Sequence, residues 1–208
     1  MRHQTTARPA NCSIAFATAA EVEPGRNDAG SPDYLASRLA ARRAVRAALP
    51  AALEIRIQRR AGAAPSVLGT ARPIALSLTH CDGRAAAIAA PAPARIGIDL
   101  EREDAIAPVH ARYFLTTRER AALGTHSLAA LWALKEAAWK ALALPDTTRF
   151  HDLELGIDDA GTLAEVRTTC RTFHASATLD IPWPGYVVAS VQLGDAAPFA
   201  SACIGEAR

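Results

Sequence analysis

Two acidic side chains stand two residues apart in the segment IGIDLE, at Asp99 and Glu101. The apolar residues around them predict a β-strand over residues 95–101, and residues two apart in a strand project from the same face. Two carboxylates on one face repel each other unless a cation or protons neutralise them. Hard oxygen ligands of this kind suit magnesium. A solvated strand end would carry the same pair, so the pair alone does not establish a metal site.

A second polar group lies in SLAALWALKEAAWKAL, which predicts a helix over residues 127–142 with Ser127 as its cap. At about 100° per residue, five of its large or charged residues fall on one arc of about 140°: Trp132, Lys135, Glu136, Trp139 and Lys140. Glu136 and Lys140 are spaced i,i+4, which is also the spacing of an ordinary surface ion pair. Two tryptophans on the same arc favour a partly buried charged site.

Two other segments carry side chains suited to phosphate. His80 lies in SLTHCDG, where a predicted strand enters a turn, although a lone histidine is more often structural. Arg38, Arg42 and Arg46 recur every four residues on a predicted helix that begins at Ser31-Pro32. Guanidinium groups bind phosphate well, but such a stripe also suits a solvated helix face. The sequence does not show which side of this helix faces the core.

Composition narrows the classes of function. The formal net charge of +2 over 208 residues gives no general argument for binding nucleic acid or a membrane. The four cysteines form no CxxC pair, so they indicate neither zinc nor redox chemistry and fit a reducing compartment. No run approaches the roughly 20 apolar residues of a membrane span, and the first residues lack the apolar core of a signal peptide. We therefore expect a cytoplasmic protein.

The remaining segments indicate how these residues are positioned. Apolar runs bounded by turn residues predict strands at 12–20, 53–59, 74–80, 95–101, 151–157, 162–168, 171–179 and 185–193. The alanine-rich run at 85–90 fits either a strand of the same sheet or a helix. Helical patterns occupy a stretch after Ser31, residues 109–123 and residues 127–142. The order is strand, helix, strands, then helices and strands, which indicates an α+β fold with small, mainly antiparallel sheets.

In this order and spacing, SLTHCDG, IGIDLE and LWALKEAAWKAL resemble the 4′-phosphopantetheinyl transferase superfamily. The resemblance is closest to its monomeric, two-lobed type, which primes the carrier domains of peptide and polyketide synthetases. It covers about residues 74–142, is looser for the first helix, and is only topological after about residue 150. It implies two similar α/β lobes in a pseudo-twofold arrangement, residues 1–104 and 105–208, with the active site between them.

The resemblance also implies roles for individual residues. Asp99, Glu101 and Glu136 match the family's metal carboxylates, and Glu136 is in addition the candidate base. Lys140 matches a lysine that contacts phosphates, and His80 matches a histidine that contacts the 3′-phosphate of coenzyme A. Three further residues are included with the coenzyme A-binding set: Thr79, beside that histidine, and Arg38 and Arg46, on the first helix. The stretch ALALPDTT departs from the family, which usually has a glycine after the lysine.

The expected activity is Mg²⁺-dependent transfer of 4′-phosphopantetheine from coenzyme A to a serine of an acyl or peptidyl carrier protein, which releases 3′,5′-ADP. One alternative is a non-catalytic relative that binds a carrier protein or coenzyme A, although the retained acidic triad argues against it. A nucleic-acid-binding module is a second alternative, opposed by the near-zero net charge. A third is another magnesium-dependent phosphoryl or nucleotidyl enzyme, although the chain has no GxxxxGK[ST] loop.

Overall fold

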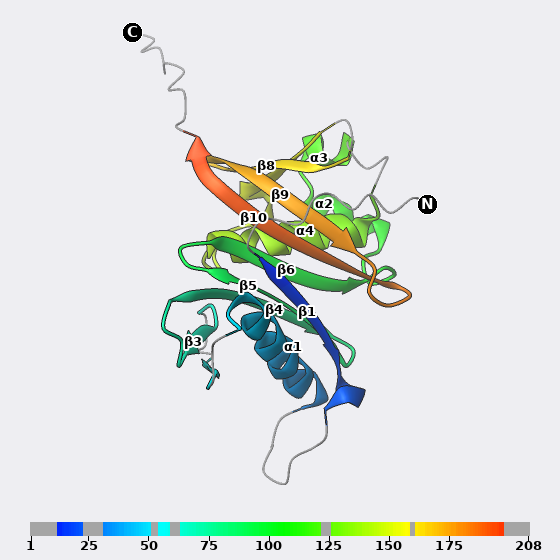
Figure 1. The fold of residues 1–208 in the computed structure, drawn as a ribbon. Helices are drawn as coiled ribbons and strands as arrows, with labels where there is room; N and C mark the ends of the chain where they lie inside the picture. Colours follow the sequence, from blue (N-terminus) through cyan, green and yellow to red (C-terminus); the bar gives the residue numbers. More distant parts are fainter. Residues whose placement is uncertain are drawn as a thin grey trace.

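The computed structural model describes residues 12–22, 31–50, 54–58, 63–121, 126–158 and 161–197. Over these ranges the chain forms antiparallel sheets and helices, which confirms the expected α+β class (Figure 1). Parts of the strand predicted over residues 53–59 and of the helical stretch predicted over residues 109–123 lie outside the described residues.

The first half of the chain packs one long helix on a three-stranded sheet. The strands are β1 (Ser13–Thr18), β4 (Ile74–Cys81) and β5 (Arg84–Pro91), in the order β1-β5-β4. The helix, α1 (Pro32–Ala48), is capped by the Ser31 side chain, which accepts a hydrogen bond from the backbone N–H of Tyr34. Its alanine-rich side is buried against the sheet, so the arginine side faces outward. A short hairpin of β2 (Arg56–Gln58) and β3 (Ser66–Leu68) lies beside this layer, and β3 was not predicted.

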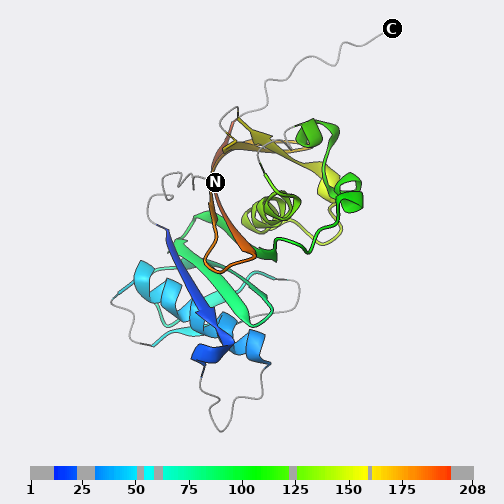
Figure 2. The ribbon, with the colours of Figure 1, turned by 90° about the vertical axis from the view of Figure 1, so that its right-hand side faces the viewer.

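The second half is a five-stranded sheet that curves around a central helix. Its strands are β6 (Arg95–Arg102), β7 (Leu153–Ile157), β8 (Leu163–Thr168), β9 (Thr172–Asp180) and β10 (Tyr186–Ala197), in the order β6-β10-β9-β8-β7. Figure 2 shows α4 (Leu128–Leu142) inside this curve. Short helices complete the described part of this half: η2 (Pro108–His110), α2 (Ala111–Phe114), α3 (Thr117–Ala121) and η3 (Phe150–Asp152). A further 3₁₀ turn, η1 (Ala19–Glu21), follows β1.

The two sheets share a connection pattern. In each, the first strand pairs with the last and the last pairs with the strand before it, as β1-β5-β4 and as β6-β10-β9. By its pairing, β6 belongs to the second sheet, although it precedes the predicted division at residue 104, which stays a prediction. The sheets meet where β4 runs beside β6, and there the backbone N–H of Ile98 donates to the Ser77 hydroxyl at 3.2 Å.

Strand β6 and helix α4 approach each other closely at Gly97. A Cβ atom placed on Gly97 would lie 1.8 Å from the backbone oxygen of Ala137 and 2.9 Å from the backbone nitrogen of Ala141. The clash would be with helix backbone, which cannot move aside as a flexible side chain could. Only glycine therefore permits this separation of β6 and α4. The alanines along the buried face of α4 serve the same close packing.

Helix α4 begins and ends with recognisable caps. The Ser127 side chain accepts from the backbone N–H of Ala130, as expected from sequence. At the other end Ala143 adopts a left-handed conformation with φ of 51°, and its N–H bonds to the Lys140 carbonyl. A side chain in this conformation costs about 1 kcal/mol relative to glycine.

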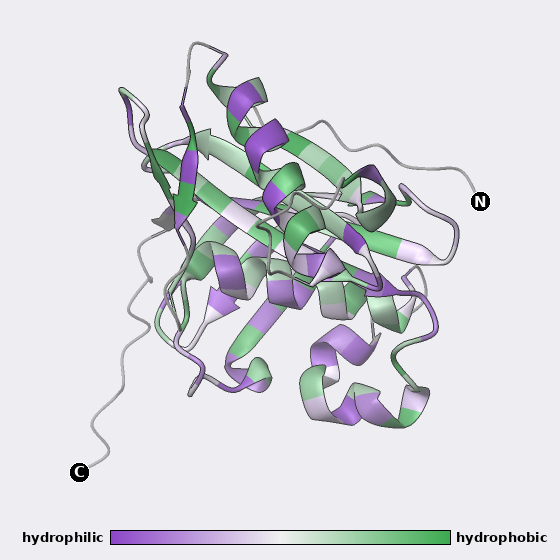
Figure 3. Ribbon diagram, turned by 90° about the horizontal axis from the view of Figure 1, so that it is seen from below, coloured by the Kyte–Doolittle hydropathy of each residue, from purple (hydrophilic) through white to green (hydrophobic). Residues whose placement is uncertain are grey.

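Polar and apolar residues alternate along the helices, as Figure 3 shows by the hydropathy of each residue. This pattern is expected of helices with one buried face. Among the described residues, no helix is both long and apolar enough to cross a membrane.

We predict that Gly97→Ala lowers the free energy of unfolding by about 2–3 kcal/mol, because the added methyl group must push α4 away from β6. Gly194→Ala, in β10, is the matched control, since a Cβ there would lie 3.8 Å from its nearest neighbours. The control should change stability by no more than about 0.5 kcal/mol. Urea unfolding of both variants measures the difference, and equal stabilities would contradict the close-approach argument.

Candidate metal and phosphate site

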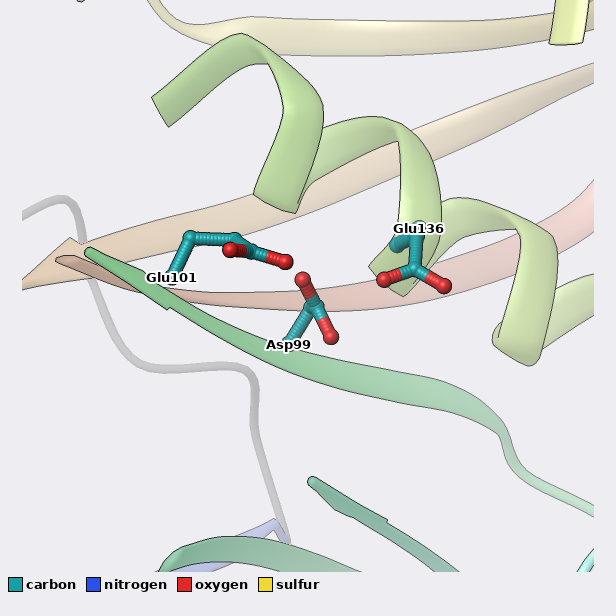
Figure 4. Close-up of side chains that lie close together, drawn as sticks. All are labelled: Asp99, Glu101 and Glu136. Carbon is teal, nitrogen blue, oxygen red and sulfur yellow. The ribbon is translucent and has the colours of Figure 1, made fainter. Parts of the chain in front are cut away.

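Three carboxylates from two elements converge at one point beside α4. Asp99 and Glu101 project from the same face of β6, and Glu136 projects toward them from α4 (Figure 4). Each residue offers one carboxylate oxygen, and these three oxygens all lie within 4.8 Å of one another. The alternation of side chains along a strand explains the first pair, as the sequence predicted. The close approach at Gly97 brings the third within reach.

Asp99 is the most buried of the three, with 2% of its surface exposed. Its Oδ1 accepts a hydrogen bond from the Thr79 hydroxyl at 3.1 Å and an ion-paired hydrogen bond from Lys140 Nζ at 2.7 Å. Its Oδ2 is buried, with no donor among the described residues. A buried carboxylate oxygen without a donor is costly, so a cation or a proton is needed on that side of Asp99.

The two glutamates have strongly shifted acidities. Burial, followed by the charge of Asp99, raises the pKa of Glu101 to about 7. Burial, again followed by the charge of Asp99, raises the pKa of Glu136 to about 7. Near neutral pH these groups therefore hold protons or exchange them for a cation. All three possible ligands are hard carboxylates, and one of them, Asp99, has an oxygen, Oδ2, with no hydrogen-bond donor among the described residues. Such a set fits Mg²⁺ better than a softer metal.

Lys140 has a different partner from the one expected. The helical spacing suggested a pair with Glu136, but Lys140 Nζ forms its ion pair with Asp99 Oδ1 at 2.7 Å and also donates to the Ile98 carbonyl at 3.2 Å. The charge of Lys140 still acts on Glu136, where it opposes the rise of the pKa. The reason is again the closeness of β6, whose backbone lies within reach of the lysine. The Lys140 side chain is 30% exposed, so its ammonium group borders both the carboxylates and solvent.

A pocket of about 230 Å³ opens over these groups. Six of the predicted residues line it, namely Thr79, His80, Asp99, Glu101, Glu136 and Lys140. His80 is 41% exposed, and its Nδ1 lies 3.9 Å from a carboxylate oxygen of Asp33 at the start of α1. The pocket lies where β4, β6 and α4 meet, at the junction of the two sheets.

The predicted arginines of α1 do not line this pocket. Arg38 donates to the Ile57 carbonyl, and its guanidinium lies over the Tyr34 ring with 5.7 Å to the ring centroid. Arg46 is exposed on the helix surface. The proposed contact of both arginines with a ligand stays a prediction.

A larger groove of about 1190 Å³ adjoins the pocket between the start of β4 and the end of α4. Leu78 and Lys140 line both spaces, so the two are continuous at these side chains. The walls of the groove are mainly apolar, with Arg95 and Asp146 as charged members besides Lys140. A ligand with a charged centre at the carboxylates therefore has room for a long neutral arm.

Aromatic side chains hold the outer side of α4. The Trp132 ring stacks on Phe150 with centroids 4.8 Å apart, and its indole group opposes the rise in the pKa of Glu101. Phe114 meets the same tryptophan edge-on at 5.0 Å. The sequence indicated that the two tryptophans of α4 are partly buried, and both are.

The sequence did not point to Glu119, which is fully buried together with Lys135. Lys135 Nζ lies 2.7 Å from Glu119 Oε2, and burial lowers the pKa of Lys135. A signal was present, because Thr116 and Glu119 have the spacing of a capping box at the start of α3. Nothing in that local pattern shows that the glutamate also reaches α4.

Comparisons with known proteins address the family. Residues 95–191 match the model of the 4′-phosphopantetheinyl transferase superfamily. No curated protein resembles the chain closely enough to count as a match. A solved structure, the holo-[acyl-carrier-protein] synthase of Thermotoga maritima, matches at 25% identity with a TM-score of 0.40. That match covers 48% of this chain and 62% of the synthase chain. The segment that matches this family model includes all three carboxylates and Lys140.

Proposed function

We propose that this protein transfers 4′-phosphopantetheine from coenzyme A to a serine of an acyl or peptidyl carrier protein. The observation that carries the proposal is the convergence of Asp99, Glu101 and Glu136 beside the partly exposed Lys140. Such a site can hold a divalent cation and a pyrophosphate at the same time. The family match over the segment that contains these residues supports the choice of reaction.

The three carboxylates would hold Mg²⁺. When bound, the ion would neutralise negative charge on the pyrophosphate oxygens. The residues of the chain position the reactants around that charge. Lys140 would offer its ammonium group to a pyrophosphate oxygen, because it reaches the pocket from the solvent side of Asp99. His80 would contact the 3′-phosphate from the exposed rim, Thr79 would orient Asp99, and Arg38 and Arg46 would contribute positive charge from α1.

The transfer needs no reactant besides coenzyme A and the carrier serine, since one bond forms and one breaks. The carrier serine Oγ forms a bond to the β-phosphorus of coenzyme A, the bond from that phosphorus to the bridging oxygen breaks, and 3′,5′-ADP leaves. The serine proton would pass to Glu136, directly or through a water molecule. Holding serine and pyrophosphate in line is the main contribution of the protein.

The partner and the lobes follow from the same proposal. Residues 1–104 and 105–208 would form the two lobes of a monomer, with coenzyme A between them. The apo form of the carrier protein would approach the open side of the pocket. No contact with nucleic acid or a membrane is required.

A mass assay tests the activity directly. Purified protein, Mg²⁺, coenzyme A and an apo-carrier are mixed, and the carrier is weighed. We expect the gain of one phosphopantetheine group with the unaltered protein. Asp99→Ala and Glu136→Ala should each lower the rate at least about 1000-fold, because each removes a charge that the transition state needs.

Glu103→Ala is the matched control for these variants. Glu103 is an exposed acidic residue two positions after Glu101, as Glu101 is two positions after Asp99, but it does not line the pocket. It should retain normal transfer. Normal turnover in either Asp99→Ala or Glu136→Ala would remove that residue from the mechanism, and absence of transfer with several carriers would favour a non-catalytic binding protein.

We predict that Lys140→Met lowers turnover about 100-fold or more while the melting temperature in Mg²⁺ changes little. The cation would offset the charge of Asp99 in place of the lost ammonium, whereas the pyrophosphate would lose its contact. Turnover and thermal unfolding are measured on the same preparation. An equal proportional loss in both would indicate that Lys140 is structural.

The shifted glutamates predict how stability and cation affinity depend on pH. The folded-state pKa of Glu101 and Glu136 is about 7, above the ordinary value of 4.5. Protonated carboxyls with raised pKa stabilise the fold below the unfolded pKa, and that stabilisation is lost as pH rises through about 7. The contribution of these two groups to the melting temperature of cation-free protein should therefore fall between pH 4.5 and about pH 7 and level off above that range.

Magnesium should oppose this fall, because it replaces the protons. Its affinity should rise with pH, by up to about tenfold per unit for each proton displaced. The double variant Glu101→Gln/Glu136→Gln should show neither effect. Identical pH profiles with and without Mg²⁺ would contradict the assignment of the cation to these carboxylates.

A further inference from the structure

Among the described residues, Lys135 and Glu119 form an ion pair with both side chains fully buried. Lys135 Nζ donates to Glu119 Oε2 at 2.7 Å and to the Phe114 carbonyl at 2.6 Å. Glu119 accepts in addition from the backbone N–H of Thr116 at 2.7 Å and of Leu155 at 2.8 Å. Each carboxylate oxygen therefore has a donor, and the pair joins α4 to α2, α3 and β7.

Such a pair is a weak source of stability. Removing two charges from water costs several kcal/mol per ion, which their attraction only repays when the geometry is good. Two apolar side chains of similar volume would often serve the fold as well or better. Stability alone therefore does not explain why a charged pair occupies this position.

The surroundings of α4 suggest that account. Of the nine buried residues of the helix, six are alanines, at positions 129, 130, 133, 137, 138 and 141, and the others are Leu131, Leu134 and Lys135. Methyl groups are too short to fix how the helix is rotated about its axis, and the larger apolar side chains, Leu131, Leu134 and the two tryptophans, make contacts without the directionality of a hydrogen bond between charged groups. Directional contacts of charged side chains with neighbouring elements come from Lys140, on the β6 side, and from Lys135, on the side of α2 and α3.

These two contacts differ in their relation to the site. Lys140 is itself part of the pocket and would turn to a pyrophosphate when a substrate binds. Lys135 is not among the residues that line the pocket, and its partners lie away from it. Because Lys135 and Glu136 are adjacent, about 100° apart around the helix, fixing one fixes the direction of the other.

We propose that the Lys135–Glu119 pair is a positioning device that sets the rotation of α4, so that Glu136 faces Asp99 and Glu101 whether or not a substrate is bound. Lys135 and Glu119 are positioning residues, since neither touches the reacting groups. The inference rests on the proposed function for its catalytic consequence, but its structural content is independent of that function.

The double variant Glu119→Leu/Lys135→Met tests the proposal. It removes both charges together, so that no unpaired charge remains buried. Because the backbone N–H groups of Thr116 and Leu155 lose their acceptor, its melting temperature should fall by several degrees, while the protein stays folded. We expect cation affinity, measured with Mn²⁺ by electron paramagnetic resonance, to fall about 10–100-fold. We expect a large fall in kcat and only a small change in KM, because Glu136 no longer points at the reacting groups.

A control variant removes an ion pair that does not contact α4. Glu21→Gln/Arg43→Met deletes the pair beside α1, in which the two charged groups lie 2.7 Å apart. It should leave Mn²⁺ affinity and transfer unchanged. A comparable loss of Mn²⁺ affinity in this control would attribute the effect to loss of charge in general and would overturn the proposal.

A crystal structure of the double variant provides a readout that does not depend on activity. We expect the Glu136 carboxylate to leave the 4.8 Å range of the other two. A structure in which the three oxygens still converge, or unchanged Mn²⁺ binding, would overturn the proposal. Unaltered protein that holds the three carboxylates together but transfers nothing would instead contradict only the proposed function.

Discussion

Mutual repulsion between Asp99, Glu101 and Glu136 is the constraint on which the surrounding structure depends. Three carboxylates within 4.8 Å of one another are unfavourable unless positive charge or protons offset them. Lys140 and the Thr79 hydroxyl satisfy one oxygen of Asp99, while its other oxygen has no donor. The raised pKa values of the two glutamates show that the protein alone does not complete the compensation.

The elements around the carboxylates meet this constraint from different directions. Glycine at position 97 allows α4 to lie directly on β6, which brings Glu136 and Lys140 onto the acidic strand. Thr79 comes from the other sheet, across the line where β4 runs beside β6. The three carboxylates and Lys140 therefore come from the second half of the chain, and Thr79 and His80 complete the pocket from the first half.

Local patterns were enough to predict most of the elements and the core of the site. Asp99 and Glu101 could be placed on one face because a strand has a fixed alternation, and the caps of α1 and α4 could be placed at Ser31 and Ser127. The orientation of α1 could not be predicted, because alanine and leucine are both compatible with a core. The short strand β3 was missed, since three residues carry too little periodicity.

The contacts that escaped prediction are those between distant segments. Lys140 was expected beside Glu136 on its own helix, but it pairs with Asp99 because a neighbouring strand lies closer than helical spacing can reveal. Glu119 was not selected, since its partner Lys135 is 16 residues away and depends on how α3 folds back against α4. The family resemblance predicted that the three carboxylates lie together. Their separate sequence patterns were equally compatible with solvated surface residues.

Lysine is rare in this chain, and both copies lie within α4, in a sequence that otherwise uses arginine for positive charge. The buried copy fits a space bounded by a carboxylate and a carbonyl oxygen, and the other lies between a carboxylate and solvent. A planar guanidinium is broader and cannot give up its proton, so neither space accepts the more common cation without rearrangement. Replacing lysine by arginine is usually counted as conservative, but on this helix it would act as a change of shape.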